Sequence, residues 1–284
     1  MSQSLLALLI LIGGNVFSTL YDVVIKALGE GAPVFLFLVL RQGMATLLLL
    51  PSWQRQPRAR RFHGPALRLH GLRAAVALLG AVALIQALTH LPLATASALF
   101  FSAPLQTVLL GALLFGERPG RITTLATLLG FVGVLVILRP GEINLYGILA
   151  FLAGTSLALS NLLLRRLPQE ESSTNTLLMM QVLGLPVLAL LAWLEQGSLS
   201  WHLVGVAALA NGLLLIYQWC CVRAYRLAPA SDIASGEFAG LLFAVLFGLL
   251  FFGEVPDLPM LLGALLVVAP MIWANRRRPA AVTD

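Results

Sequence analysis

The sequence is a succession of apolar runs, separated by short segments that contain proline, glycine or charged residues. A helix needs about 20 apolar residues to cross the hydrocarbon core of a bilayer, and these runs are of that length. Backbone polar groups find no water there, so an all-helical membrane fold is predicted. The ten predicted spans are 4–28, 33–51, 69–90, 93–116, 120–138, 145–164, 176–194, 202–222, 231–252 and 257–274.

The composition excludes several other classes of protein. Of the 284 residues 59% are hydrophobic and only 11% are charged, too few to cover a soluble protein with a polar surface. The net charge of +6 comes from arginines at the ends of apolar runs, so we expect contact with anionic lipid headgroups and not with nucleic acid. Cys220 and Cys221 are adjacent, which rules out a disulfide framework or metal site built on them.

The distribution of arginine predicts how the chain crosses the membrane. With ten spans, the connections on one side carry 14 arginines and those on the other carry Arg139 alone. Connections rich in Arg and Lys remain in the cytoplasm. We therefore predict a multi-pass protein of the cytoplasmic (inner) membrane with both termini in the cytoplasm. No basic residue precedes the first apolar run, which is interpreted as a span and not a cleaved signal peptide.

One segment of the chain occurs twice. Residues 92–117 and 229–254 both run from proline through an apolar stretch to Gly-Glu, 137 positions apart, and residues 22–26 weakly resemble 161–165. This repeat predicts two halves, 1–140 and 141–284, of five spans each. Five is an odd number, so the second half is inverted in the membrane. Inverted repeats are typical of secondary transporters that work by alternating access; the alternative is a duplication without moving parts.

Several short motifs follow one another along the spans: Gly13-Gly14-Asn15 with Lys26, Leu40-Arg41-Gln42, Pro104, Gly116-Glu117, Gly130 with Gly133, Arg165-Arg166 and Gly253-Glu254. Their order resembles the EamA-type members of the drug/metabolite transporter superfamily, over nearly the whole chain. The resemblance implies a ten-span carrier of small organic solutes, often amino acids or other metabolites. It implies neither an enzyme nor a cofactor.

Two further points qualify the resemblance. Leu241 stands where the repeat of Pro104 is expected, so a bend in the ninth span either comes from Gly236 and Gly240 or is absent. The run 252–257 is also similar to members that carry S-adenosylmethionine or a vitamin-like metabolite. That substrate class is the alternative to an amino-acid-like solute.

Ionisable residues inside the spans are the first candidates for substrate binding or coupling, because charge in hydrocarbon costs several kcal/mol. Glu237 is interpreted as a proton-coupling carboxylate or a counter-ion, or as a structural partner of an arginine. Arg41 can grip a carboxylate of the substrate or form an ion pair with Asp22 or Glu237. Asp22 and Lys26 are four residues apart on one helix face, and a local pair between them is favoured over a site.

Uncharged polar residues in the spans are candidates for the lining of a central cavity. Each has helix–helix hydrogen bonding or an interfacial position as its alternative role. Tyr217 and Trp219 can also stack on a planar or cationic ligand. The full set is Asn15, Tyr21, Gln86, Ser97, Ser102, Gln106, Asn161, Gln181, Asn211, Tyr217, Gln218 and Trp219.

Other residues are interpreted as structural. Glu117 and Glu254 precede a proline at a span start and are expected to cap helices. The four histidines lack metal-ligand spacing, and no phosphate-binding loop is present to support ATP-driven transport. A lipid-modifying enzyme would need clustered His, Asp and Glu at one interface, and a membrane sensor or scaffold would usually carry an added soluble domain. The predicted partners are a small-molecule substrate and the lipid bilayer; the sequence does not indicate an oligomeric state.

Overall fold

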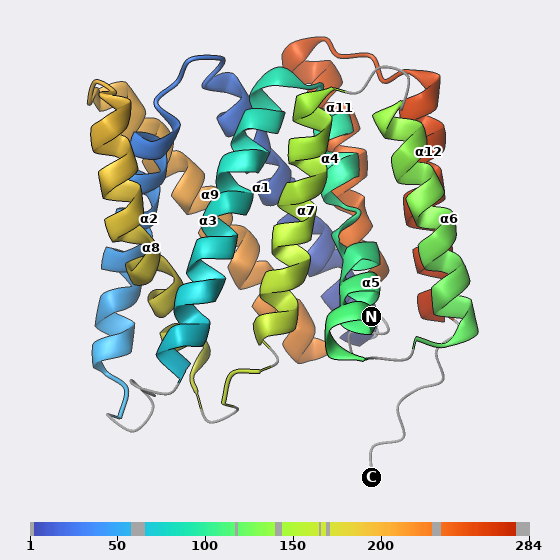
Figure 1. Cartoon of the computed structure of the whole chain (residues 1–284), viewed down its shortest axis with the longest axis horizontal. Coiled ribbons are helices and arrows are strands. Elements are labelled where there is room, and N and C mark those ends of the chain that lie inside the picture. The colour runs from blue at the N-terminus through green and yellow to red at the C-terminus, as the bar shows by residue number, and fades with distance from the viewer. Residues whose placement is uncertain are drawn as a thin grey trace.

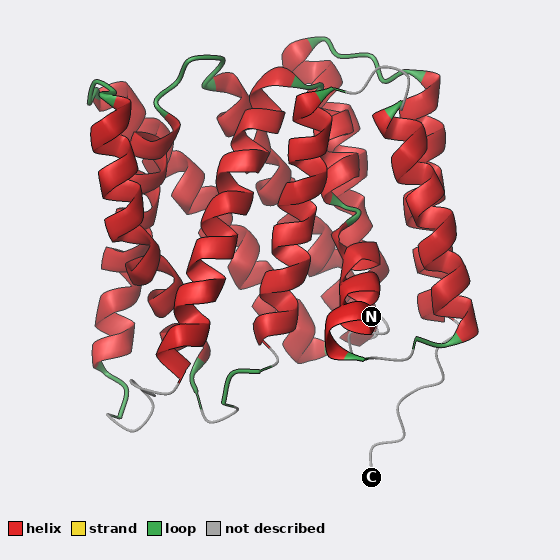
Figure 2. Ribbon diagram, in the orientation of Figure 1, coloured by secondary structure: helices red, strands yellow, loops and turns green. Residues whose placement is uncertain are grey.

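In the computed structural model the protein is a bundle of helices whose axes run roughly along one common direction (Figures 1 and 2). The structure describes residues 3–57, 66–116, 119–139, 144–164, 166–168, 171–228 and 234–276. Within these ranges every regular element is helical. Glu117 and Arg165, and most arginines of the segment between the second and third spans and of the segment after the tenth, lie outside the described residues.

The helices correspond to the predicted spans. They are α1 (Gln3–Ala27), α2 (Val34–Gln54), α3 (Leu67–His90), α4 (Leu93–Phe100), α5 (Ala103–Phe115), α6 (Arg121–Leu138), α7 (Leu145–Leu164), α8 (Ser173–Glu195), α9 (Trp201–Leu227), η4 (Ala234–Phe238), α11 (Ala239–Phe252) and α12 (Leu258–Arg276). Among the described residues eight segments are long and apolar enough to cross a membrane, with α4 and α5 counted together. The shorter apolar helices Gly236–Phe252 and Leu258–Ala274 bring the total to ten. The all-helical, ten-span prediction is confirmed.

The fourth and ninth spans are both interrupted, at equivalent places. In the fourth span α4 ends at Phe100, Phe101 follows as its C-cap, and α5 begins at Ala103; in the ninth the 3-10 helix η4 ends at Phe238 and the α-helix α11 begins at Ala239. Phe101 and Phe238 are 137 positions apart, the offset of the sequence repeat. The ninth span is therefore interrupted although Leu241 replaces the proline.

The Gly-Glu motif has a backbone explanation. Gly116 and Gly253 end α5 and α11 in the left-handed conformation, with φ of 66° and 65°. Glycine adopts this conformation without the steric cost that a Cβ atom would add, and it is the usual residue after a helix end. Both copies of the repeat thus end their helix in the same way.

Helix neighbours also match between the halves. The pair α1–α9 corresponds to the pair α3–α7, and the pair α2–α9 corresponds to α3–α8. Likewise, α1 contacts η4 and α11, and its counterpart α7 contacts α4 and α5. The pairs α2–α8 and α6–α12 each join a helix to its own counterpart, and the pair α4–α11 joins the fourth span to the ninth. We propose from this pattern that 1–140 and 141–284 form two inverted halves related by an approximate two-fold axis.

The chain reverses direction at each connection, so α1 begins and α12 ends on the same side of the bundle (Figure 1). We call this side the inner face and the opposite side the outer face; they are the lower and upper sides in Figure 1. The helix pair α6–α12 stands at one edge of the bundle and α2–α8 at the other.

The crossing of α6 and α12 depends on two glycines. A Cβ atom added at Gly133 would lie 2.6 Å from the backbone oxygen of Gly263, and one added at Gly263 would lie 2.7 Å from the oxygen of Gly133. Side chains cannot relieve a clash with backbone atoms. The two helices approach this closely only because neither has a side chain there.

We predict that Gly133→Ala destabilises the protein by about 1–3 kcal/mol, because the added methyl forces α6 and α12 apart. Gly43→Ala is the matched control, since a Cβ atom at Gly43 of α2 meets nothing within 4 Å. Thermal unfolding in detergent should therefore shift downward for Gly133→Ala and stay level or rise for Gly43→Ala. Equal shifts in the two variants would contradict this account of the crossing.

Candidate functional site

Arg41 of the second span lies beside an aromatic ring of the first. It is 8% exposed, and its guanidinium carbon is 6.0 Å from the centre of the Tyr21 ring of α1. Asp22 follows Tyr21 in the same helix and is partly buried. The Nε atom of Arg41 is buried and makes no hydrogen bond within the described part of the chain. We call Tyr21, Asp22 and Arg41 the charged cluster.

The charged cluster lies well inside the membrane-spanning part of the bundle. Tyr21 precedes Leu28 by seven residues, and Arg41 follows Pro33 by eight. At a rise of 1.5 Å per residue, both side chains start roughly 10–12 Å below the connection between α1 and α2. Ionisable groups at such depth usually serve a substrate or ion pathway.

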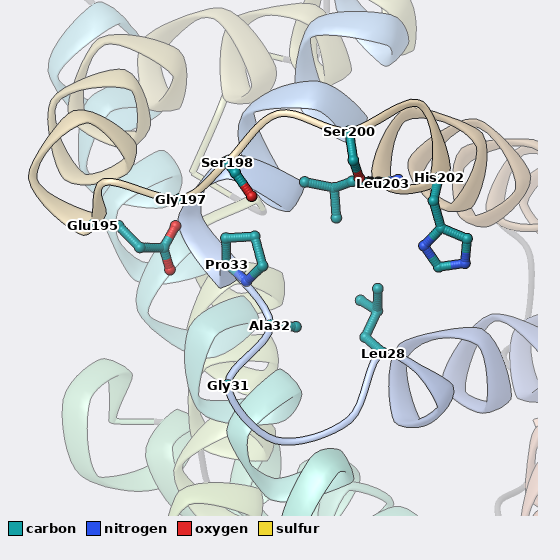
Figure 3. A pocket seen from close by; sticks show the side chains of 10 residues that line it. All are labelled: Leu28, Gly31, Ala32, Pro33, Glu195, Gly197, Ser198, Ser200, His202 and Leu203. Atoms are coloured by element: carbon teal, nitrogen blue, oxygen red, sulfur yellow. Dashed lines mark hydrogen bonds between the residues drawn. The ribbon is translucent and has the colours of Figure 1, made fainter.

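A pocket of about 380 Å³ opens on the outer face above the charged cluster. We call it the outer pocket; it lies between the α1–α2 and α8–α9 connections and is lined by Leu28, Gly31, Ala32, Pro33, Glu195, Gly197, Ser198, Ser200, His202 and Leu203. Figure 3 shows Glu195 and His202 on opposite sides of it, with Ser198 and Ser200 between them. The first half supplies one wall and the second half supplies the other.

Glu195 was not among the predicted site residues, and its place in the outer pocket is fixed by the start of α2. Its two carboxylate oxygens accept hydrogen bonds from the backbone N–H groups of Phe35 at 3.2 Å and Leu36 at 3.0 Å. The first N–H groups of a helix have no partner inside the helix and favour an anion. Glu195 therefore ties the outer end of α8 to the outer end of α2.

The expected local pair between Asp22 and Lys26 is wrong. The Lys26 ammonium lies 2.9 Å from Glu254, at the end of α11, and donates to the carbonyl oxygens of Leu88 and Leu91 at the end of α3. It also lies 5.3 Å from the centre of the Phe252 ring. The Lys26 ammonium therefore pairs with these groups and not with Asp22, which lies one turn away.

Glu254 does cap a helix, but not the one that follows it. Its second carboxylate oxygen accepts a hydrogen bond of 2.6 Å from the N–H group of Leu93, the first residue of α4. The start of α12 is capped instead by Asp257, which accepts from the N–H group of Met260. Glu254 and Lys26 therefore join α1, α3, α4 and α11 near the outer face.

Three of the predicted polar residues make buried hydrogen bonds between helices or to backbone. Asn15 donates to the carbonyl oxygen of Gly236 at 2.8 Å. Gln106 donates to the Ser102 hydroxyl at 2.8 Å and to the carbonyl oxygen of Phe151 at 3.1 Å. All three side chains are almost fully buried. These contacts favour the structural alternative for Asn15, Ser102 and Gln106.

The remaining candidates are scattered. Gln86 lines a mostly apolar pocket of about 540 Å³ between α2, α3, α7 and α8. Trp219 is 66% exposed on α9, which favours contact with lipid, and Asn161 is also exposed. Tyr217, Gln218 and Gln181 are partly buried, whereas Ser97 and Asn211 are buried. Within the described residues no group of three or more His, Cys, Asp and Glu side chains is placed to hold a metal ion.

Glu237 lies in η4, directly before the interruption of the ninth span, and is partly buried. It is within electrostatic range of Cys221 on α9. It does not join the charged cluster through any described ion pair.

Comparison with known proteins gives a consistent result. A model described as the EamA-like transporter family matches residues 5–139 and again residues 144–276. The riboflavin transporter of Vibrio cholerae is 30% identical over 73% of this chain and 71% of its own length. The pseudopaline exporter CntI of Pseudomonas aeruginosa strain PAO1 is 26% identical over 95% of this chain and 96% of its own.

The S-adenosylmethionine uptake transporter of Rickettsia prowazekii is 24% identical over 91% of this chain and 88% of its own. One crystal structure matches with a TM-score of 0.55 and 20% identity, over 96% of this chain and 99% of that one. At this identity the structural likeness shows the fold alone.

We predict that the pair of Lys26 and Glu254 is energetically coupled. Lys26→Met leaves a largely buried carboxylate without its cation and should cost about 2 kcal/mol in the free energy of unfolding. The double variant Lys26→Met with Glu254→Gln keeps an acceptor for the Leu93 N–H group and should recover part of that loss. SDS titration in micelles measures both, and simple additivity of the single changes would show that the contact is unimportant.

Proposed function

The chain belongs to the EamA-like transporter family, and we propose that it carries a small zwitterionic metabolite, with an amino-acid-like head group, across the cytoplasmic membrane by alternating access. Its relatives are named as transporters of small metabolites and not as enzymes, which supports the general class. The chain is a multi-pass membrane protein. The finer substrate class, the route and the coupling are our proposal.

The observation that carries the proposal is the charged cluster below the outer pocket. Arg41 presents a planar fork that grips a carboxylate with two parallel hydrogen bonds, and its buried Nε atom makes no hydrogen bond within the described residues. Asp22 supplies a counter-charge for a substrate ammonium group. The ring of Tyr21 lies beside the Arg41 guanidinium, and an aromatic face of this kind can also pack on a substrate cation. A zwitterion would thus leave no net charge buried in the membrane.

The route to this site is expected to start at the outer pocket. Its two walls come from different halves of the chain, so a relative rotation of the halves would change its width. The arginine count assigns the inner face to the cytoplasm. In this proposal the structure represents a conformation whose substrate path opens away from the cytoplasm.

A ligand screen tests the substrate class. Detergent-solubilised protein is heated with amino acids, S-adenosylmethionine, riboflavin, nucleosides and quaternary amines, since a ligand that binds the folded state raises the unfolding temperature. We predict that compounds with an amino-acid head group stabilise the wild type but not Arg41→Gln. Arg139→Gln serves as control because Arg139 lies exposed on the outer face, paired with Asp257.

Three results would count against this proposal. Stabilisation by riboflavin alone would favour the vitamin-like alternative, in which Tyr21 and Arg41 pack on a flat ring. Full stabilisation of Arg41→Gln by the wild-type ligand would remove Arg41 from the site. Absence of transport in proteoliposomes, despite binding, would favour the sensor alternative.

Glu237 is our candidate for proton coupling, because it lies at the interruption of the ninth span, where a local change of backbone can accompany transport. We predict that uptake or efflux by Glu237→Gln in proteoliposomes no longer responds to an imposed pH gradient, whereas exchange at equal pH persists. Glu30→Gln, in the exposed α1–α2 connection, is the control. An unchanged response in Glu237→Gln would exclude this carboxylate from coupling.

A further inference from the structure

A second group of ionisable and polar side chains lies at the inner end of the bundle, away from the charged cluster. It contains Trp53 at the end of α2, His70 and Arg73 near the start of α3, Glu171 just before α8, and Asn175 in the first turn of α8. We call these five residues the inner latch. None of these five residues was among the predicted site residues.

Direct contacts connect the members of the inner latch. Glu171 Oε1 lies 2.8 Å from His70 Nε2 and accepts a 2.7 Å hydrogen bond from the Asn175 amide. The same amide accepts a 2.8 Å hydrogen bond from the Trp53 indole N–H through its oxygen. Side chains of α3 and α8 therefore contact Glu171, and a side chain of α2 is hydrogen-bonded to α8.

A flanking contact strengthens the same junction. The Ser172 hydroxyl donates to the side-chain oxygen of Gln56 at 2.6 Å and accepts from the N–H group of Asn175, which caps α8. The first half contributes α2 and α3 and the second half contributes the start of α8. The inner latch therefore joins the two halves where α2, α3 and α8 end at the inner face.

The inner latch is buried although it is made of charged and polar groups. The side chains of His70 and Glu171 are 3% and 1% exposed, and Arg73 is 5% exposed. Two nitrogens of Arg73, both ring nitrogens of His70 and Glu171 Oε2 make no hydrogen bond within the described residues, so His70 and Glu171 meet as an ion-pair contact. Apolar side chains would hold helices together at lower cost than buried charges with incomplete pairing. A group that must sometimes separate and become hydrated, however, needs polar side chains.

The location gives this cluster a specific role. Along α2 and α8 the outer end borders the outer pocket, whereas the inner end is closed by the Trp53–Asn175 hydrogen bond. The charged cluster on α1 and α2 lies between these two levels. We propose that the inner latch is the inner gate of the transporter, closed in this conformation, and that the bond between His70 and Glu171 breaks when the path opens to the inner face.

Glu171 is the charged centre of the inner latch. Within the described residues His70 and Arg73, both from α3, face it. The nearby side chains from the α2 and α8 sides, Trp53, Gln56, Ser172 and Asn175, are neutral.

Accessibility of a buried cysteine tests the gate without any substrate. Leu178 is one turn beyond Asn175 in α8 and is 2% exposed. A Leu178→Cys reporter, in a Cys220→Ala and Cys221→Ala background, reacts with a maleimide only when the inner end opens. Adding Glu171→Gln should accelerate labelling by roughly tenfold or more, because it removes one member of a buried ion pair from the closed state.

Asp257→Asn is the matched control, since Asp257 pairs with Arg139 on the exposed outer face and links α12 to the end of α6. It should leave labelling unchanged. The rates are divided by those of the unfolded protein under the same conditions, which corrects for the intrinsic reactivity of the thiol. Labelling that is unchanged by Glu171→Gln would overturn the proposal.

A reversible cross-link keeps the test decisive if Glu171→Gln fails to fold. Cysteines at 70 and 171 are bridged by a short bis-methanethiosulfonate reagent. Locking should stop transport of the ligand found in the screen, and reduction should restore it; undiminished transport by the locked protein would exclude a gate. This arm rests on the proposed transport function, whereas maleimide labelling does not. Unaltered labelling therefore refutes the gate, and absent transport with altered labelling refutes only the function.

Discussion

The interrupted spans depend on side chains that bind the backbone carbonyls beside each interruption, because a bilayer offers no water to do so. In the first half the Ser102 hydroxyl donates to the carbonyl oxygen of Leu99. In the second half the Asn15 amide donates to that of Gly236, which is 137 positions after Leu99. The next equivalent pair of carbonyls, again 137 apart, is bound in the same way: Ala103 by Thr107 and Gly240 by Thr19.

Equivalent backbone positions are thus satisfied by different residues from different helices. In the first half the donors lie on the interrupted span itself, whereas in the second half they come from α1. What the two halves share is the requirement for a donor, and not the residue that meets it. This explains why the sequence repeat is clear in Gly116 and Gly253, where only glycine fits, and faint in the polar residues.

The need to pair buried polar groups also applies to the charged residues, which lie at three depths in the bundle. Lys26 and Glu254 are fully engaged near the outer face, and Glu195 is engaged by the start of α2. Near the middle, Arg41 has a buried nitrogen without a hydrogen bond among the described residues. At the inner face, the inner latch is buried but incompletely paired. The charged residues that stabilise the fold have hydrogen-bond or ion-pair partners. Those that we assign to substrate binding and to the gate keep polar atoms without a hydrogen bond among the described residues.

The sequence predicted the helices well and their side-chain partners poorly. Apolar length defines a span, so the predicted 69–90 and 145–164 agree closely with α3 and α7. The partners of Lys26 and Glu195 lie 228 and 160 positions away, and no local spacing indicates them. The i, i+4 spacing predicted a pair between Lys26 and Asp22. In the structure Lys26 instead contacts several acceptors at the ends of α3 and α11. One feature of the sequence could have indicated the role of Glu195: it is an acidic residue at the outer end of a span, where it can cap a neighbouring helix.

The central claim is that the outer pocket and the inner latch open in alternation around the charged cluster. Spin-label distances measure this directly, with one pair at Ala32 and Ser198 across the outer pocket and another at Arg68 and Ser173 across the inner latch. These positions lie in connections or at helix ends. Binding of the ligand found in the screen should shorten one distance as it lengthens the other. Two distances that stay fixed, or that grow together, would contradict alternating access in this protein.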